Sequence, residues 1–295
     1  MPDLNKTKWR GARLNAAQIS NELASGKDFS GSLIDGEHLH RGSEIFASLS
    51  GANLSGSNFN SARINLLRAE GCDFSNSTFI GAKISSLVAR SSDFSGSDFE
   101  GAKIYGANFN LAKFIRANMA KVEISSENNK SAMAISFEGA DMRELNLSCA
   151  RIGEILAGYD MHNIEPKINF SGAILDGSNL SNAIIVRADF SKVSMQRAIV
   201  KSTSIYSSDM SNMNLSGSSF ANSNFVSVRF DNLKAFDVNL DNAKFELISA
   251  KKALLSGVSA VGAKAMGLVL VDVKIAIGKE IYNVSGNFGI TPISS

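Results

Sequence analysis

The chain has 295 residues, and its 30 basic and 28 acidic residues leave a net charge of +2. This near balance argues against a surface that is acidic throughout. No apolar run is long enough to cross a bilayer, and no N-terminal apolar stretch resembles a cleavable signal peptide. We therefore expect no transmembrane segment, and a chain that is either cytoplasmic or exported without a cleavable signal.

The first predicted element lies in an N-terminal segment, residues 1–26. Asn15 suits a helix N-cap, and Gln18 stands at the capping-box position three residues later. The stretch Ala16–Ala24 favours helix, and Gly26 can end it. The sequence predicts a short helix that caps the next part of the chain.

The second part, residues 27–275, has a large apolar residue at every fifth position. Twenty such positions run from Phe29 to Ile124, and seventeen of them hold Leu, Ile, Met or Phe. Twenty-two run from Phe170 to Ile275, and eighteen of them hold Leu, Ile, Val, Met or Phe. Because a helix repeats every 3.6 residues and a strand every two, neither sustains this period.

A period of five is explained by a very short strand followed by a corner. A small residue such as Ala52 stands two positions before the central Leu54, so both side chains point inward, and Asn53 between them points outward. The next two positions are rich in Ser, Gly and Asn, which tolerate the backbone angles of a corner. Four corners close a square, which predicts stacked coils of about twenty residues with a filled interior.

Two exceptions to the pattern support the coil of twenty. Ala69 and Ala89 occupy central positions, and Leu67 and Leu87 stand two residues earlier, where a small residue is usual. The large and small residues are therefore exchanged at two sites that lie twenty residues apart. On coils of that length the two exchanges stack directly and leave no void.

The repeat is interrupted at two places, near residues 125–134 and 157–167. Successive central residues there are thirteen and eighteen residues apart. We expect both segments to leave the same corner on successive coils and to form loops for a partner, since loops on rigid scaffolds often carry function. They would present Glu127, Asn128, Lys130, Tyr159, Asp160, His162, Glu165 and Lys167. The alternative is that both segments are tolerated insertions without a role.

A smaller irregularity lies around Glu37–Phe46, where Glu44 occupies a central position.

The last part, residues 276–295, is predicted to be a C-terminal cap or tail. The stretch Ile281–Ile293 is read as a strand or an irregular cap, because it contains Gly286, Gly289 and Pro292.

Residues capable of catalysis or metal binding are few. Cys72 and Cys149 are predicted to be free structural thiols. His38 and His40 should both point outward and lack further ligands for a metal, and no nucleophile and base are paired near His162. We therefore expect no catalytic residue, no cofactor and no metal.

The repeat resembles that of a known family. Its units include Ala52-Asn53-Leu54-Ser55-Gly56 and Ala188-Asp189-Phe190-Ser191-Lys192. They are similar to those of pentapeptide-repeat proteins, whose fold is a right-handed quadrilateral β-helix. The predicted fold is therefore all-β, with the short N-terminal capping helix. The entry into the repeat at Gly26-Lys27-Asp28-Phe29 also looks like the start of the repeat domain in some bacterial effector ubiquitin ligases, but no residues remain for their catalytic domain.

The resemblance implies a non-catalytic scaffold, from a bacterium, that binds a protein partner, with a secreted effector as one form of it. One alternative is a DNA mimic that binds a type II topoisomerase such as gyrase, which would need an acidic face formed by Asp73, Asp93 and Asp98. A second alternative is an enzyme with its site in the two loops. We do not expect a nucleic-acid partner, because no aromatic residues interleave with the basic ones.

Overall fold

The computed structural model describes residues 10, 13–14, 28–29, 31–35, 47–125, 134–153, 168–277, 280–288 and 291–292. The chain forms two compact units, Met1–Asn146 and Leu147–Ser295. The regular elements in these described ranges are β-strands, and none of the described residues forms a helix that could cross a membrane. The predicted helix at Ala16–Ala24 lies outside the described residues.

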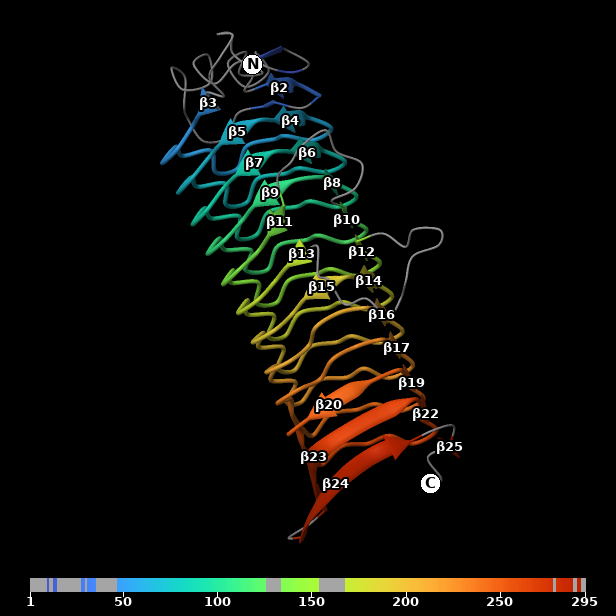
Figure 1. The fold of residues 1–295 in the computed structure, drawn as a ribbon. Coiled ribbons are helices and arrows are strands. Elements are labelled where there is room, and N and C mark those ends of the chain that lie inside the picture. The colour runs from blue at the N-terminus through green and yellow to red at the C-terminus, as the bar shows by residue number, and fades with distance from the viewer. Residues whose placement is uncertain are drawn as a thin grey trace. The chain divides into compact units, whose positions relative to one another are not determined.

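Unit 1 is a stack of coils whose short strands form two parallel sheets (Figure 1). The first sheet contains, in order, β1 (Arg13–Leu14), β2 (Leu33–Asp35), β4 (Arg63–Asn65), β6 (Lys83–Ser85), β8 (Lys103–Ile104) and β10 (Glu123–Ile124). The second contains β3 (Ala47–Ser48), β5 (Leu67–Arg68), β7 (Leu87–Val88), β9 (Ala107–Asn108) and β11 (Ile135–Ser136). The predicted β-solenoid is confirmed.

Strand register confirms the coil of twenty residues. Ile64 pairs with Ile84, Ile84 with Ile104, and Ile104 with Ile124. Four consecutive central positions, at Leu54, Phe59, Ile64 and Ala69, are all buried, so the coil has four inward-facing sides.

The exchanged positions stack as expected. Leu67, Ala69, Leu87 and Ala89 are all buried, and the N–H of Ala69 donates to the carbonyl of Val88 at 2.7 Å. Each bulky leucine therefore occupies volume that the adjacent alanine leaves free, which maintains the packing density of the interior.

The corners depend on one residue per unit in the left-handed region. Gly51 has φ = 75° inside a turn closed by a hydrogen bond of 2.9 Å from Ala52 N–H to Leu49 C=O. A positive φ at the third position of such a turn is the signature of type II, which favours Gly or Asn. Asn76, with φ = 56°, occupies the same position on a later coil. The Gly, Asn and Ser of the repeat are thus explained by the corners.

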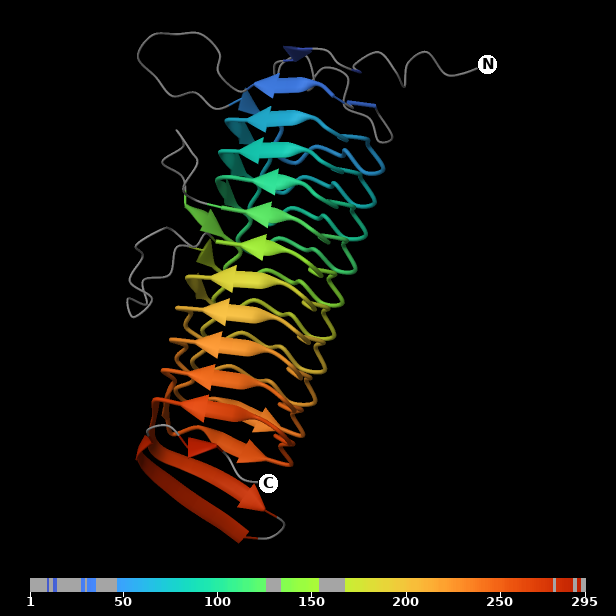
Figure 2. The same ribbon diagram turned by 90° about the vertical axis from the view of Figure 1, so that its right-hand side faces the viewer.

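Unit 2 repeats this arrangement (Figure 2). Its first sheet contains β12 (Arg151–Ile152), β14 (Ile184–Val186), β16 (Ser204–Tyr206), β17 (Asn224–Val226), β19 (Lys244–Glu246), β22 (Lys264–Met266) and β25 (Thr291–Pro292), while β13 (Ile168–Asn169) pairs with β15 (Ala188–Asp189). A further sheet has the order β18 (Lys234–Phe236), β21 (Leu254–Ser256), β23 (Leu268–Ile277), β20 (Ser249–Lys251). The long β24 (Glu280–Phe288) pairs antiparallel with β23.

The pairing of the described residues shows three coils that are longer than twenty residues. In unit 1, Ile34 pairs with Ile64, thirty residues later, and Asn108 pairs with Ser136, twenty-eight residues later. In unit 2, Arg151 pairs with Ile184, thirty-three residues later. The register therefore accommodates ten, eight and thirteen additional residues.

Candidate interaction surfaces

The interior of each unit is filled by its own side chains. In unit 1, Phe59, Phe79 and Phe99 stack face to face, with ring centroids 4.8 and 4.4 Å apart. In unit 2, Phe170 stacks on Phe190 at 4.9 Å. Since these rings are almost fully buried, they occupy the axis where a chamber for a substrate would have to lie.

Small polar residues inside the coils are used for hydrogen bonds between coils. The Ser77 hydroxyl donates to the carbonyl of Leu54 at 2.9 Å, and the Thr203 hydroxyl donates to that of Leu180 at 2.7 Å. Both acceptors lie twenty-three residues earlier, at the central position of the preceding coil. These inward hydroxyls therefore satisfy buried carbonyls and are accounted for structurally.

The two cysteines are free thiols in different environments. Cys72 occupies a small inward position, and its Sγ donates to the carbonyl of Leu49 at 2.9 Å. Burial raises the pKa of the Cys72 thiol to about 11, so this side chain is protonated at neutral pH and is a poor nucleophile. Cys149 is exposed. Within the described residues, no three or more His, Cys, Asp or Glu side chains cluster as metal ligands would.

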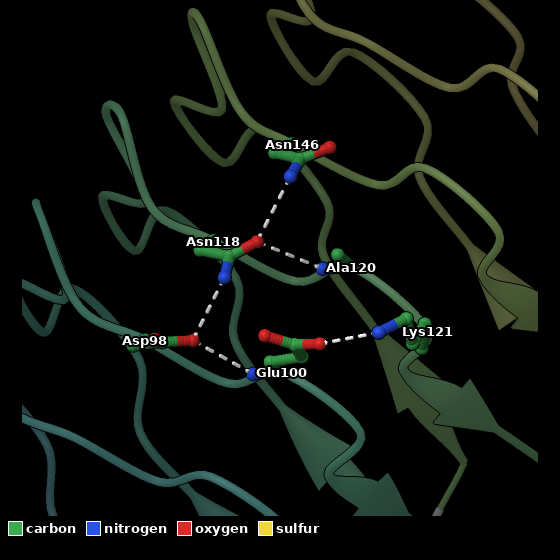
Figure 3. Close-up of polar contacts among 6 residues, drawn as sticks. All are labelled: Asp98, Glu100, Asn118, Ala120, Lys121 and Asn146. Atoms are coloured by element: carbon green, nitrogen blue, oxygen red, sulfur yellow. Dashed lines mark hydrogen bonds and ion pairs between the residues drawn. The ribbon is translucent and has the colours of Figure 1, made fainter.

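On the outward surface, Asx side chains form ladders along the coils (Figure 3). Asn118 Nδ2 donates to Asp98 Oδ1 at 3.0 Å, and Asn146 Nδ2 donates to Asn118 Oδ1 at 2.9 Å. The same oxygens accept the N–H groups of Glu100 and Ala120, two residues further along the chain. Each side chain therefore closes its own turn and joins the next coil.

Several charged side chains on the outward surface of unit 1 are paired with opposite charges. Lys121 Nζ lies 2.6 Å from Glu100 Oε1, and Arg116 Nε lies 2.8 Å from Glu144 Oε2. The hydrogen bond and charge of Arg116 hold the pKa of the Glu144 carboxyl below its usual value. Because these pairs are exposed, each contributes little stability, but they leave a surface of mixed sign.

The acidic face that the DNA-mimic alternative would need is not assembled as a continuous row. Asp73 and Asp93 are neighbours in one row, but Lys113 follows them and Asp141 comes next. Lys113 Nζ lies 3.9 Å from Asp93 Oδ2. Asp98 belongs to a different row, the ladder described above. The three carboxylates therefore do not form one stripe.

The eight predicted partner-binding residues lie outside the described residues, as do His38, His40 and Glu44. The strands that flank the segments near residues 125–134 and 157–167 are among the described residues. In unit 1, β10 ends at Ile124 and β11 begins at Ile135, and in unit 2, β12 ends at Ile152 and β13 begins at Ile168. Each segment thus connects one sheet of its unit to the next.

One surface was missed by the sequence analysis, at the last coils of unit 2. Outward positions that elsewhere hold Ser, Asn or Asp here hold exposed apolar residues, such as Val261, Val269 and Val271. The signal was present in the sequence as a change to Ala- and Val-rich units after residue 250.

Comparison with known proteins identifies the repeat. A family model described as pentapeptide repeats matches eight copies, in residues 45–76, 92–125 and 167–201. A search of curated proteins finds no match.

Three solved structures are similar to the chain over most of its length. HetL, a pentapeptide-repeat protein of the cyanobacterium Nostoc sp., has 16% identity over 88% of this chain and 98% of HetL, with a TM-score of 0.33. QnrB1, a plasmid-mediated fluoroquinolone resistance protein, has 15% identity over 86% of this chain and 87% of QnrB1, with a TM-score of 0.27. An alginate lyase from Paenibacillus sp. has 10% identity over 85% of this chain and 96% of the lyase, with a TM-score of 0.33.

Since all three TM-scores are below 0.5, these similarities carry no argument about function. Within each matched stretch, residues twenty positions apart pair in register, as Asn53 does with Asp73, Asp98 with Asn118 and Ile174 with Ser194. On this evidence, residues 45–76, 92–125 and 167–201 are pentapeptide repeats.

Proposed function

We propose that this protein is a non-catalytic interaction scaffold that binds a protein partner through its outward faces and the segments at 125–134 and 157–167. The observation that supports the proposal is the filled interior of each unit, illustrated by Phe79, Phe99 and Phe170, which are at most 1% exposed. Recognition must then use the outward side chains.

The outward side chains are well suited to binding because the coils hold them at fixed spacing. Neighbouring strands lie about 4.8 Å apart, and the ladder from Asp98 through Asn118 to Asn146 joins successive coils. A surface that is already ordered loses little conformational entropy when a partner binds.

The two segments are the second part of the proposal. They carry Glu127, Asn128, Lys130, Tyr159, Asp160, His162, Glu165 and Lys167. They interrupt a repeat that is otherwise maintained over many coils, and each is anchored by described strands on both sides. The bacterial-effector form of the proposal rests only on the resemblance at the N-terminal segment.

The alternatives receive no support from a specific observation. A DNA mimic needs a continuous negative stripe, and Lys113 interrupts the row of Asp73 and Asp93. An enzyme needs convergent polar groups in a concavity, whereas the buried Ser77 and Thr203 hydroxyls are used for hydrogen bonds between coils.

Affinity capture with deletions that restore the repeat tests the proposal. Removing residues 126–133 and 154–166 brings each interrupted coil back to twenty residues, so both variants should fold, which circular dichroism checks. Lys201→Arg, which keeps the charge of an exposed side chain on an outward face of unit 2, is the control.

We expect wild type and the control to capture one partner that the deletion variants lose, and the purified partner to show the same pattern. Identical capture by all variants would overturn the role of the segments. Capture of no partner by the wild type would overturn the scaffold function.

A further inference from the structure

The C-terminal strands of unit 2 end in an open sheet edge. β24 pairs with β23 from Ile277↔Glu280 to Leu268↔Phe288 and with no other strand in the described ranges. It lies outermost in unit 2 (Figures 1 and 2). Alternate N–H and C=O groups on its other edge therefore face away from the sheet, as on any edge strand that can accept a further strand.

The register places two rows of side chains on the outer face of this sheet. Ala235 and Val273 point inward and are each 2% exposed, so the residues on either side of them point outward. The first row is Lys234, Leu254, Lys274 and Asn283. The second row is Phe236, Ser256, Ala276 and Ile281. Basic and apolar side chains thus run side by side up to the open edge.

Exposed apolar residues are concentrated in the last coils of unit 2. Of eleven large apolar side chains that are exposed in the described part of the chain, six lie between residues 261 and 282. They are Val261, Met266, Val269, Val271, Ile281 and Tyr282. Ile281 is 67% exposed and Tyr282 is 48% exposed, although neighbours in a strand point to opposite faces, so β24 is exposed on both of its faces.

The charge of this region favours an acidic partner. Residues 244–288 contain six lysines and three acidic residues, a net charge of +3. Ion pairs within the described ranges involve none of the lysines Lys244, Lys251, Lys252, Lys264 and Lys274. A second copy of the chain would bring the same positive charge against this surface, which opposes self-association.

We propose that the free edge of β24 and the outer face beside it dock an acidic, partly apolar segment of another protein, which adds as an extended strand. Backbone hydrogen bonds to β24 would supply affinity, while Lys274 and Ile281, which lie in neighbouring rows of the same outer face, would select an acidic and an apolar side chain two residues apart. The inference rests on the proposed function only in that the partner is a protein, and it uses different residues from the two interrupting segments.

The test is binding of a fluorescent peptide of about twelve residues with the repeat Glu-Thr-Val-Thr, which places glutamate and valine in turn on one face of a strand, to the full chain, followed by fluorescence polarisation. The same peptide with lysine in place of glutamate tests charge, and one N-methylated at alternate residues tests strand addition. Lys274→Glu and Ile281→Glu disrupt the surface. Lys201→Glu makes the same charge change on another face of unit 2 and is the matched control.

We expect the acidic peptide to bind and the lysine and N-methylated peptides to fail. Lys274→Glu should weaken binding about tenfold, which corresponds to ~1.4 kcal/mol, while Lys201→Glu should change it less than about twofold. Equal binding of all three peptides, or equal loss in both lysine variants, would overturn the inference.

Two further measurements test whether a membrane or a second copy of the chain occupies this surface instead. Binding of phosphatidylserine vesicles without binding of the peptide would assign the surface to a membrane and overturn the inference. So would a concentration-dependent dimer that Ile281→Glu abolishes, measured by sedimentation equilibrium. If the peptide fails while affinity capture still yields a partner, this inference is wrong and the proposed function stands.

Discussion

The filled interior predicts a large loss of stability when a stacked phenylalanine is truncated. Phe94 is 1% exposed, and its ring stacks on Phe74 and Phe114 with centroids 4.9 Å away on both sides. It also makes edge contacts with Phe79 and Phe99, at 6.0 and 5.6 Å. Phe94→Ala removes the centre of this cluster.

The magnitude follows from the buried volume that the substitution empties and from the ring stacking that it abolishes. A buried Phe→Ala change costs about 3–5 kcal/mol through transfer and cavity terms. Each stacked pair adds about 0.5–1.5 kcal/mol beyond burial, so we expect the upper end of that range. Phe94→Leu should cost only about 1–2 kcal/mol, because Leu54 occupies an equivalent position in the same row of coils.

Urea unfolding followed by far-ultraviolet circular dichroism measures the loss of stability. Hydrogen exchange locates it, since solenoid coils contact mainly their neighbours, and protection should fall first around the Phe94 N–H, which donates to the Lys113 carbonyl at 2.7 Å. Ile80→Ala, at a side chain 41% exposed, is the control. Equal losses of stability for Phe94→Ala and Ile80→Ala would refute a dry, packed interior.

Three further predictions concern individual polar groups. The pKa of the Cys72 thiol is about 11 in the folded protein, against the ordinary value of 9.0. The protonated thiol therefore contributes fully to the free energy of unfolding below about pH 9, and this contribution is lost as the pH rises to about 11. Cys72→Ser should abolish up to about 2.7 kcal/mol of this loss at alkaline pH, as measured by urea unfolding. Asn118→Asp places a carboxylate against Asp98 in the ladder of Figure 3. The free energy of unfolding should fall by about 1–2 kcal/mol at pH 7 and recover near pH 4, where one of the two carboxylates is protonated. A loss of stability that does not depend on pH would contradict this prediction. Lys121→Met removes an exposed ion pair with Glu100 and should cost less than about 1 kcal/mol in thermal unfolding, whereas a loss above about 2 kcal/mol would show that the pair matters more than its exposure implies.

The core could be predicted from the sequence because all three determinants of a coil are local. The large residue, the small residue two positions earlier and the corner residue all lie within five positions. Even the exchange at Leu67 and Ala69 was predictable, since its counterpart at Leu87 and Ala89 lies one coil away and all four side chains are buried. The candidate loops could be located by the broken period, but their structure lies outside the described residues.

The C-terminal hairpin could not be predicted because it keeps the period of five while changing the corner. Leu270 and Ile275 still stand five residues apart, as in any coil. The chain passes this corner through Asp272, with φ = 53°, where the register to β24 shifts between Leu270 and Val273. β23 therefore continues across the corner as one strand. The antiparallel pairing of β24 with β23 is not specified by the five-residue pattern, because that pattern determines only the stacking of parallel coils.

The longer coil at the start of unit 1 shows the limit of an argument from periodicity. Insertions of eight and thirteen residues shift the central positions and are visible in the sequence, but an insertion of ten residues is two whole units and shifts nothing. Only the stacking of the coils identifies this insertion. The ring of Phe29 stacks on the ring of Phe59, thirty residues later, with centroids 4.9 Å apart, whereas a coil of twenty residues would have placed Leu49 beside it. The sequence held one indication, Glu44, because an unpaired carboxylate at a central position would have to be buried among apolar side chains at a cost of several kcal/mol. A charged residue at a repeat position is thus stronger evidence against a regular coil than correct spacing is evidence for one.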